Sequence, residues 1–336
     1  MAPTLVSFHD RIHELPDFDD IPIQEGVPPS AIWGLWDQNG QKDELGSLNL
    51  LTPAVVGEAA KEVRAGVSVS LNLALNQPSV AVFRRQALSH TIRDNSTFSS
   101  SQSFDDTVLF NTQSGSQWDG LRHIVHPNGL LYNGVTKHEI VGPESTMRLG
   151  IHRWHDRGCI TGRGVLIDLV KYSQRHDITY DPTRFFAFTG RDLQTAAFEQ
   201  GVTFKQGDIL TVRTGFLKWY YECSDPAERT SWFLDSARES VGISADRETI
   251  AWVWNHHFSA VAGDNLAWEA MPMPDKSPSF HEYLIPSWGT PIGELWDLEE
   301  LSSRCEELGK YSFMLVSVPL NVPGGVASPP NVVAIL

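Results

Sequence analysis

Cysteine is scarce in this chain of 336 residues: only Cys159, Cys223 and Cys305 occur, and no two of them form a Cys-x-x-Cys pair. Such an odd and dispersed set argues against a disulfide scaffold or a cysteine zinc cluster, and it is typical of a reducing compartment. The chain also lacks an apolar run as long as a membrane span, and residues 1–30 lack the apolar core of a signal peptide. We therefore expect a cytoplasmic protein.

Basic residues are also few compared with acidic ones. Lys and Arg together number 26 against 41 Asp and Glu, which gives a formal net charge of −15. An acidic chain repels phosphate backbones and anionic lipid, so we expect neither nucleic acid nor membrane as a partner. Apolar residues make up 41% of the chain, enough for a sizeable core. We predict an irregular, proline-rich arm over residues 1–30 and one α/β domain over residues 31–336.

Short apolar runs alternate with helical segments along that domain. Residues 164–170, Ile209–Arg213 and residues 313–318 have the apolar character of buried strands. Thr52 followed by Pro53 is a good helix start, and Gly66 is a plausible stop. Residues 94–107 are rich in Ser, Asp and Thr and are expected to form a loop, either a lid or a plain linker.

The most informative segment begins at Gln113. Gln113, Gln117, Asp119 and His123 are separated by even numbers of residues, which would place all four on one face of a strand. Their side chains can bind a metal or move a proton. Glycines within the segment favour bulges, and a solvated loop would collect the same residue types, so both interpretations are open.

This segment resembles the signature His-x-Gly-Thr-His-x-Asp-x-Pro-x-His of the cyclase family, which includes bacterial kynurenine formamidase and isatin hydrolase. The Gly, the Asp and the last His are present as Gly115, Asp119 and His123. The two earlier histidines, which bind metal in the family, are replaced here by Gln113 and Gln117.

Four further stretches resemble the family in the same order, namely residues 43–52, 162–168, 201–215 and 281–294. The resemblance implies a swivelling β/β/α fold, an α/β class in which helices surround a central, barrel-like sheet in a single domain. It also implies a metal-dependent hydrolase of cyclic or formyl amides and esters.

The resemblance assigns roles to individual residues. The implied metal ligands are Gln117, Asp119, His281 and Glu294. His123 is the implied general acid/base, with His126 as its partner or as the actual proton carrier. The implied substrate-binding residues are Gln113, Trp118, Arg122 and Asp264.

Two of these assignments leave alternatives open. His257 with Glu269 competes with His281 and Glu294 for the late part of the site. Trp118 either flanks the pocket or faces the opposite side of its strand.

The identity of the ion depends on the two glutamines. An amide oxygen is a neutral and weak ligand, and the loss of two imidazoles removes the nitrogen donors that suit zinc. The remaining oxygen-rich set favours manganese or magnesium over zinc, or no ion at all. The glutamines would alternatively hydrogen-bond a substrate carbonyl.

Three functions follow as hypotheses. The first is a metal-assisted hydrolase that opens an amide, lactam or lactone of a small aromatic compound, with a His general acid/base. The second is a metal-independent cyclase or dehydratase of secondary metabolism that uses a His/carboxylate pair. The third is a binding protein for a small molecule without turnover. For each we expect a homodimer or a higher even oligomer, partly because the resemblance implies it, since relatives form such oligomers. Weaker support comes from the high tryptophan count and from the arm, which has little apolar content to fold back on its own domain.

Overall fold

The computed structural model describes residues 15–96, 98, 101–235, 238–273 and 279–336. Among these residues, nine strands form a central sheet in the order β1-β13-β11-β5-β7-β9-β10-β4-β12. Strands β5, β7, β9 and β10 run parallel, and the remaining neighbours pair antiparallel. The bounds of these strands are β1 Ser68–Ser70, β4 Gln117–Asp119, β5 Ile160–Asp168, β7 Ile209–Arg213, β9 Ala260–Gly263, β10 Ile292–Glu294, β11 Ser312–Ser317, β12 Ala327–Ser328 and β13 Val332–Ile335.

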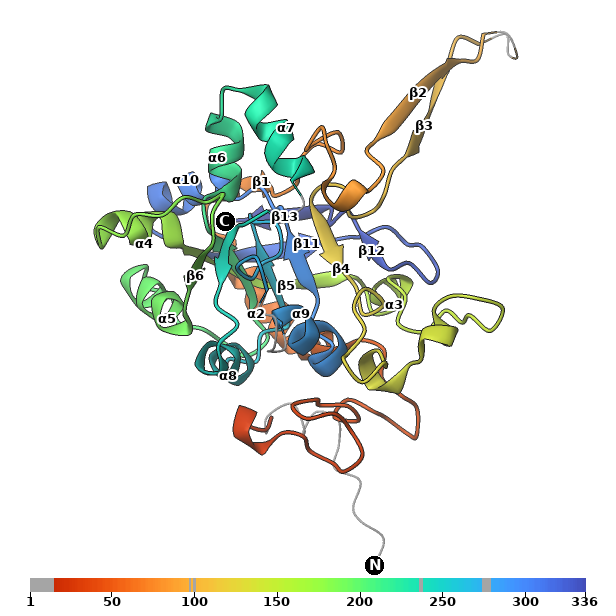
Figure 1. Cartoon of the computed structure of the whole chain (residues 1–336), viewed down its shortest axis with the longest axis vertical. Helices are drawn as coiled ribbons and strands as arrows, with labels where there is room; N and C mark the ends of the chain where they lie inside the picture. Colours follow the sequence, from red (N-terminus) through yellow and green to blue (C-terminus); the bar gives the residue numbers. More distant parts are fainter. Residues whose placement is uncertain (1–14, 97, 99–100, 236–237, 274–278) are drawn as a thin grey trace, which may run out of the picture.

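Helices lie around the curled sheet (Figure 1). The α-helices are α2 Pro53–Ala59, α3 His152–Asp156, α4 Leu169–Arg175, α5 Gly190–Glu199, α6 Phe216–Glu222, α7 Pro226–Leu234, α8 Arg247–Asn255, α9 Phe280–Glu282 and α10 Glu299–Leu308. A π-helix, η7 (Tyr283–Trp288), continues directly from α9. Short 3-10 helices are η1 Phe18–Asp20, η2 Gly46–Leu50, η3 Ala60–Glu62, η4 Val82–Arg84, η5 Tyr132–Gly134 and η6 Lys137–Glu139. The predicted α/β fold, a single domain with a barrel-like sheet inside a layer of helices, is confirmed.

Two smaller sheets complete the fold. Strands β6 (Phe186–Phe188) and β8 (Val241–Ile243) pair in parallel. Strands β2 (Ser89–Asp94) and β3 (Phe104–Leu109) form an antiparallel hairpin that projects away from the body (Figure 1). The prediction of a loop over residues 94–107 is therefore wrong at both ends, because Asp94 belongs to β2 and residues 104–107 belong to β3. The hairpin escaped prediction because its residues are exposed and show no buried, apolar alternation.

The other predicted strands agree with the structure to within a few residues, whereas the first predicted helix ends at Ala59, with η3 continuing to Glu62, short of the predicted stop at Gly66. Strand β7 has the predicted bounds, and β11 begins and ends one residue earlier than predicted. Strand β5 starts earlier, at Ile160, and ends where α4 begins. The Thr52 side chain accepts the N-terminal hydrogen bond of α2 from Val55 N, at 3.2 Å, as the sequence predicts. Fully apolar runs and caps are local signals, which is why these elements were predictable.

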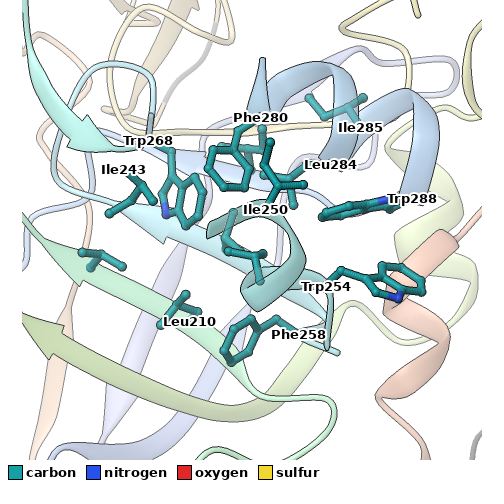
Figure 2. Packing of buried hydrophobic residues seen from close by; sticks show 14 of the residues in the cluster. Leu210, Ile243, Ile250, Trp254, Phe258, Trp268, Phe280, Leu284, Ile285 and Trp288 are labelled. Carbon is teal, nitrogen blue, oxygen red and sulfur yellow. The ribbon is translucent and has the colours of Figure 1, made fainter. Parts of the chain in front are cut away.

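Hydrophobic side chains pack in two clusters on the two sides of the sheet. Figure 2 shows part of the larger cluster, in which the ring of Trp268 lies against Phe280 and the ring of Trp254 against Trp288. Eight of the eleven tryptophans are buried in one cluster or the other. Core packing thus accounts for most of the tryptophans, so their number no longer supports an oligomer.

The described part of the N-terminal arm packs on its own domain. Phe18 and Ile21 are buried in the larger cluster. Phe18 N donates to Asn255 Oδ1 at 2.8 Å, and Trp254 Nε1 donates to Pro16 O at the same distance. The expectation that this arm has too little apolar content to fold back is wrong for residues 16–21. The first fourteen residues of the predicted arm lie outside the described residues.

Candidate metal centre

The candidate site is built on strand β4 and its neighbour β10. In the antiparallel register, Gln117 lies opposite Glu294 and Asp119 opposite Ile292. Residues directly opposite each other share a face of the sheet, and alternate residues along a strand face opposite sides. Gln117, Asp119 and Glu294 therefore project from one face, and Trp118 projects from the other.

Gln113 and His123 reach the same place from outside the strand. Gln113 lies in a turn before β4, and His123 follows a turn closed by a hydrogen bond of 3.0 Å from His123 N to Gly120 O. Of the interpretations that the sequence left open, a single strand carrying all four polar residues is wrong, because β4 spans only Gln117–Asp119. The turns at either end nevertheless bring Gln113 and His123 to Asp119.

Three side chains converge with the geometry of a metal site. The ligand atoms of Asp119, His123 and His281 all lie within 4.8 Å of one another. The Asp119 Oδ2 atom is 3.6 Å from His123 Nε2 and 3.8 Å from His281 Nε2. Asp119 is fully buried, and among the described residues its Oδ2 atom has no hydrogen-bond partner. A buried carboxylate oxygen without a partner is costly, and a cation between these atoms would remove that cost.

The two glutamines face the carboxylates through their amide nitrogens. Gln113 Nε2 donates to Asp119 Oδ1 at 2.6 Å and lies 3.2 Å from His123 Nδ1. Gln117 Nε2 donates to Glu294 Oε2 at 2.5 Å, and Gln117 Oε1 is 3.5 Å from Arg85 Nη1. In this arrangement the amide nitrogens of both glutamines face the carboxylates, and the amide oxygen of Gln117 faces Arg85.

His281 is held between two buried carboxyl groups. Its Nδ1 is 2.7 Å from Glu269 Oε1, and its Nε2 is 3.1 Å from Glu294 Oε1. Glu269 also accepts hydrogen bonds from the backbone N–H groups of Phe280 and His281. The Glu269 carboxylate thus fixes the imidazole through Nδ1 and leaves Nε2 facing Asp119 and Glu294, an arrangement typical of metal-binding histidines.

Burial and charge move the pKa values of this group in opposite directions. Burial, reinforced by the charge of Asp119, raises the pKa of Glu294 to about 7. Burial alone would lower the pKa of His281, but the nearby Asp119 carboxylate and the hydrogen bonds to Glu269 and Glu294 raise it well above 6.5. Burial also acts to raise the pKa of Asp119, yet the charges of His123 and His281 hold it below 3.8. Burial lowers the pKa of His123 despite the nearby Asp119.

These residues fit a divalent cation. One carboxylate oxygen and two imidazole nitrogens are ordinary ligands for zinc, manganese or a similar ion, and three protein ligands leave room for water or substrate. His123 supplies a nitrogen that the sequence-based ligand set did not include. The set is therefore less dominated by oxygen than the two glutamines suggested.

Comparison with known proteins identifies the family. A family model described as a putative cyclase matches residues 86–270. A crystal structure of a novel cyclase is 31% identical in sequence and superposes with a TM-score of 0.79, covering 91% of this chain and 99% of its own. This chain belongs to the cyclase family.

More distant cyclase-fold structures are isatin hydrolases. Isatin hydrolase A from Ralstonia solanacearum is 13% identical, with a TM-score of 0.56 over 89% of this chain and 99% of that one. Isatin hydrolase A from Labrenzia aggregata, bound to benzyl benzoate, is 16% identical, with a TM-score of 0.54 over 84% and 96% of the two chains. At such identities the likeness shows the fold alone. A search of curated proteins gave no match.

Several residues that the sequence put forward lie apart from the converging group. Trp118 packs on the opposite face against Trp154 and Trp296. The guanidinium of Arg122 donates to the carbonyls of Gly324 and Ile140. These contacts engage both side chains in the packing of the cyclase fold.

Asp264 and two further histidines also lie elsewhere. Asp264 accepts hydrogen bonds from the backbone N–H groups of Thr214 and Gly215, at 2.6 and 2.8 Å. His126 Nδ1 accepts from the N–H of Asn128, on an exposed turn. His257 packs against Trp254 at the end of α8, so of the two late histidines it is His281 that joins Asp119.

Sequence reasoning missed two residues. Glu269 was considered only as a partner of His257, although its carboxylate contacts His281. Arg85 was not considered. Its Nη1 donates to Gln113 O at 2.9 Å, and its charge helps to lower the pKa values of Asp119 and Glu294. Neither had a local signal, because each meets the site through a contact between distant parts of the chain.

None of the helices in the described ranges combines the length and the apolar character needed to cross a bilayer.

Proposed function

We propose that this cyclase-family chain is a metal-assisted hydrolase that opens an amide, lactam or lactone of a small aromatic compound. The observation that carries the proposal is the convergence of Asp119, His123 and His281 on one point, with Asp119 Oδ2 buried and without a partner among the described residues. The isatin hydrolases, which share the fold, motivate the substrate class.

Asp119, His123 and His281 would hold the ion. A bound divalent ion supplies a polarised carbonyl and a water molecule of lowered pKa. Glu269 fixes His281 through Nδ1, and Gln113 fixes Asp119 through Oδ1. Both ligands are thereby oriented before substrate arrives, which reduces the cost of assembling the site.

Glu294 is the group we assign to proton transfer. Its carboxyl is buried beside the three ligands, with Oε1 3.1 Å from His281 Nε2, which is a position from which a carboxylate can accept a proton and return it. This assignment exchanges two roles that the sequence suggested, in which His123 moved the proton and Glu294 held the ion. His123 stands 3.6 Å from the unpartnered oxygen, which favours it as a ligand.

Arg85 gives the site a positive charge that suits the reaction. Hydrolysis of an amide, lactam or lactone releases a carboxylate, and a guanidinium is well suited to bind one. Arg85 already contacts the backbone of Gln113 and the side chain of Gln117, so it borders the group that would hold the ion.

The test is hydrolysis by the purified protein. Isatin, N-formylkynurenine and simple aryl lactones are offered with added manganese, zinc or magnesium, before and after treatment with chelator. We expect turnover of at least one substrate class that is lost with chelator and restored by a metal. No turnover under any condition would remove these substrates, and full activity after chelation would remove the metal.

Paired variants separate the two assignments of roles. His123→Ala is expected to lower the amount of bound metal, whereas Glu294→Gln is expected to keep the metal and to lower kcat by about 100-fold or more. The opposite pattern would restore the roles inferred from the sequence. His257→Ala is the control, because that histidine lies apart from the group.

A second candidate function rests on the pair formed by His281 and Glu294. The imidazole and the carboxyl group are 3.1 Å apart and both are buried, as an acid/base pair for a metal-independent cyclase or dehydratase would be. Activity that survives complete removal of metal, but is lost in Glu294→Gln, would favour this candidate.

A further inference from the structure

Helix η4 is a strained turn that places Phe83 and Arg85 beside the candidate metal centre. It packs against α7 and ends shortly before the β2–β3 hairpin begins (Figure 1). Phe83 and Arg84 both have a φ of +56°, a left-handed conformation that residues other than glycine rarely adopt. Two such residues in succession persist only where the surrounding structure holds them, and strain of this kind is common at binding sites.

Both ends of the turn are anchored. Val82 is buried in the larger hydrophobic cluster, and Arg85 N donates to Val82 O at 3.1 Å. The Arg85 guanidinium donates to Gln113 O at 2.9 Å and lies 3.5 Å from Gln117 Oε1. The turn therefore holds this guanidinium against the two glutamines of the candidate site, whereas Phe83, between the anchors, is 49% exposed.

A second guanidinium shares the ring of Phe83. The guanidinium carbon of Arg85 lies 5.2 Å from the centre of the ring, and that of Arg238 lies 4.8 Å from the same point. The ring attracts each cation, but the two cations repel each other. One exposed ring thus holds two like charges within the span of a small ligand.

Neither arginine has a carboxylate within ion-pair distance among the described residues. Asp119 and Glu294 interact with Arg85, and Asp235 with Arg238, only from farther away. The chain has 41 acidic residues and 26 basic ones, so two neighbouring arginines without a close acid run against its composition. An anionic ligand would supply the opposite charge that the chain does not place there.

Arg238 also has a contact of its own with the body of the protein. Its Nη2 donates to Phe233 O, near the end of α7, at 3.0 Å. A cation is favourable at the C-terminus of a helix, and this role accounts for Nη2. It does not account for the position over Phe83 or for Nε, which is buried and has no hydrogen-bond partner in the part of the chain that the structure describes.

We propose that the substrate of this site is an aromatic compound with an anionic group of its own, which Arg238 binds while the substrate ring lies against Phe83. Arg85 takes the carboxylate that hydrolysis sets free, so this inference rests on the proposed function. A guanidinium binds an oxyanion such as a carboxylate through two parallel hydrogen bonds. The product then carries two negative charges, and each meets one guanidinium.

The three side chains divide the recognition between them. Phe83 is a positioning residue, because its ring holds both guanidinium groups, and it also offers an apolar surface to the substrate ring. Arg238 selects the substrate before reaction, whereas Arg85 meets a charge that appears only on hydrolysis. An uncharged aromatic substrate would leave Arg238 without a partner and is expected to bind more weakly.

The first test is binding without turnover. Benzoate and the diacids phthalate, isophthalate and terephthalate are titrated by calorimetry into the manganese-loaded protein at about pH 8, where their carboxyl groups are ionised. We expect at least one diacid to bind about tenfold or more tightly than benzoate. Equal binding of benzoate and every diacid, or no binding of any of them, would overturn the proposal.

Variants of two arginines separate a specific contact from general attraction. In Arg238→Gln the best diacid should bind within about twofold of benzoate. Arg84→Gln is the matched control, because it removes the same charge from an exposed residue of the same turn, and it should keep the preference. A preference that survives in Arg238→Gln, or that is lost equally in Arg84→Gln, would contradict the assignment.

Arg238→Lys distinguishes binding of an anion from support of α7. It keeps the positive charge, so it should retain a preference for the diacid that Arg238→Gln loses. Equal loss in both variants would reduce Arg238 to a structural role and overturn the proposal. Phe83→Leu should weaken binding of benzoate and the diacid alike, by about tenfold, and Phe83→Tyr should restore it. Unchanged binding in Phe83→Leu would refute the role of the ring.

Kinetics distinguish failure here from failure of the proposed hydrolase. If aryl esters are hydrolysed, para-acetoxybenzoate should have a KM about tenfold lower than that of phenyl acetate. Arg238→Gln should raise the KM of the charged ester alone and leave kcat unchanged. Hydrolysis of both esters with equal KM would overturn this inference and leave the hydrolase standing. A diacid preference without any turnover would remove the hydrolase and keep the anion site.

Discussion

At the scale of single residues, the carboxylate of Glu269 decides how His281 is presented. It is 1% exposed and accepts from His281 Nδ1 at 2.7 Å as well as from two backbone N–H groups. An imidazole without this partner would be free to rotate or to bind through the other nitrogen. The position of the Nε2 atom beside Asp119 therefore depends on a residue that does not itself reach the ion.

The variant Glu269→Gln should weaken metal binding about 10- to 100-fold. An amide has one oxygen, and its NH₂ group would face a donor where the carboxylate now accepts. The measurement is the dissociation constant for manganese or zinc by titration calorimetry.

Glu282→Gln provides the matched control. Glu282 lies next to His281 on helix α9, but its carboxylate accepts a hydrogen bond from Ser279 N and does not contact His281. If both variants bound metal as tightly as the wild type, the positioning role of Glu269 would be refuted.

Residue-level prediction from the sequence was uneven for physical reasons. The family signature pointed to Asp119, His123, His281 and Glu294, and the structure brings these four together. Periodicity contributed less, since the turns at Gln113 and His123 break the strand. The sequence left two positions open for Trp118, one beside the pocket and one on the opposite side of its strand. Alternation of side chains along β4 places it on the opposite side. The contact between Glu269 and His281 could not be predicted, because no local sequence pattern pairs the two residues.

At the scale of elements, the segment that carries His281 is held by a close backbone contact. Helix α9 and π-helix η7 run without a break to Gly289, whose backbone lies against Gly46 at the start of η2. Ser47 N donates to Gly289 O at 3.0 Å. A Cβ atom on Gly46 would lie 2.0 Å from Gly289 O, and Gly46 has a φ of +58°. The contact requires glycine on both counts.

The variant Gly46→Ala should therefore destabilise the protein by about 3 kcal/mol or more, from overpacking against Gly289 together with left-handed backbone strain. Gly40→Ala is the control. Gly40 also has a positive φ, +75°, but no atom lies within 4 Å of a Cβ placed there, so we expect a loss of about 1 kcal/mol. Urea unfolding measures both. Equal losses would show that the contact with Gly289 contributes nothing.

The elements also show where sequence patterns carry information. Strand β7 was predicted with its bounds because every residue in it is buried and most of its side chains are apolar. Strands β2 and β3 were missed because every residue in them is exposed, so no face is marked by burial.

At the scale of the whole molecule, the two faces of the central sheet have different roles: one packs against an apolar cluster and the other carries the candidate metal site. One side of β4 carries Trp118 into an apolar cluster, and the other carries Asp119 into the candidate site. The α/β class and the barrel-like sheet were predictable because family motifs spread over much of the chain. The convergence of residues 119, 123 and 281 depends on the pairing of β10 with β4 and on the path of α9. Those contacts join distant parts of the chain. The family motifs imply them, whereas the hydrophobic periodicity of a single segment carries no information about them.

The central claim is that Asp119, His123 and His281 hold one divalent ion. The most direct measurement is the metal content of the purified protein by mass spectrometry, after equilibration with manganese and zinc and removal of free ions. We predict about one ion per chain in the wild type, loss of that ion in His281→Ala, and its retention in His257→Ala, where the histidine lies apart from the group. A wild type without bound metal, or a His281→Ala variant that keeps a full complement, would contradict the account.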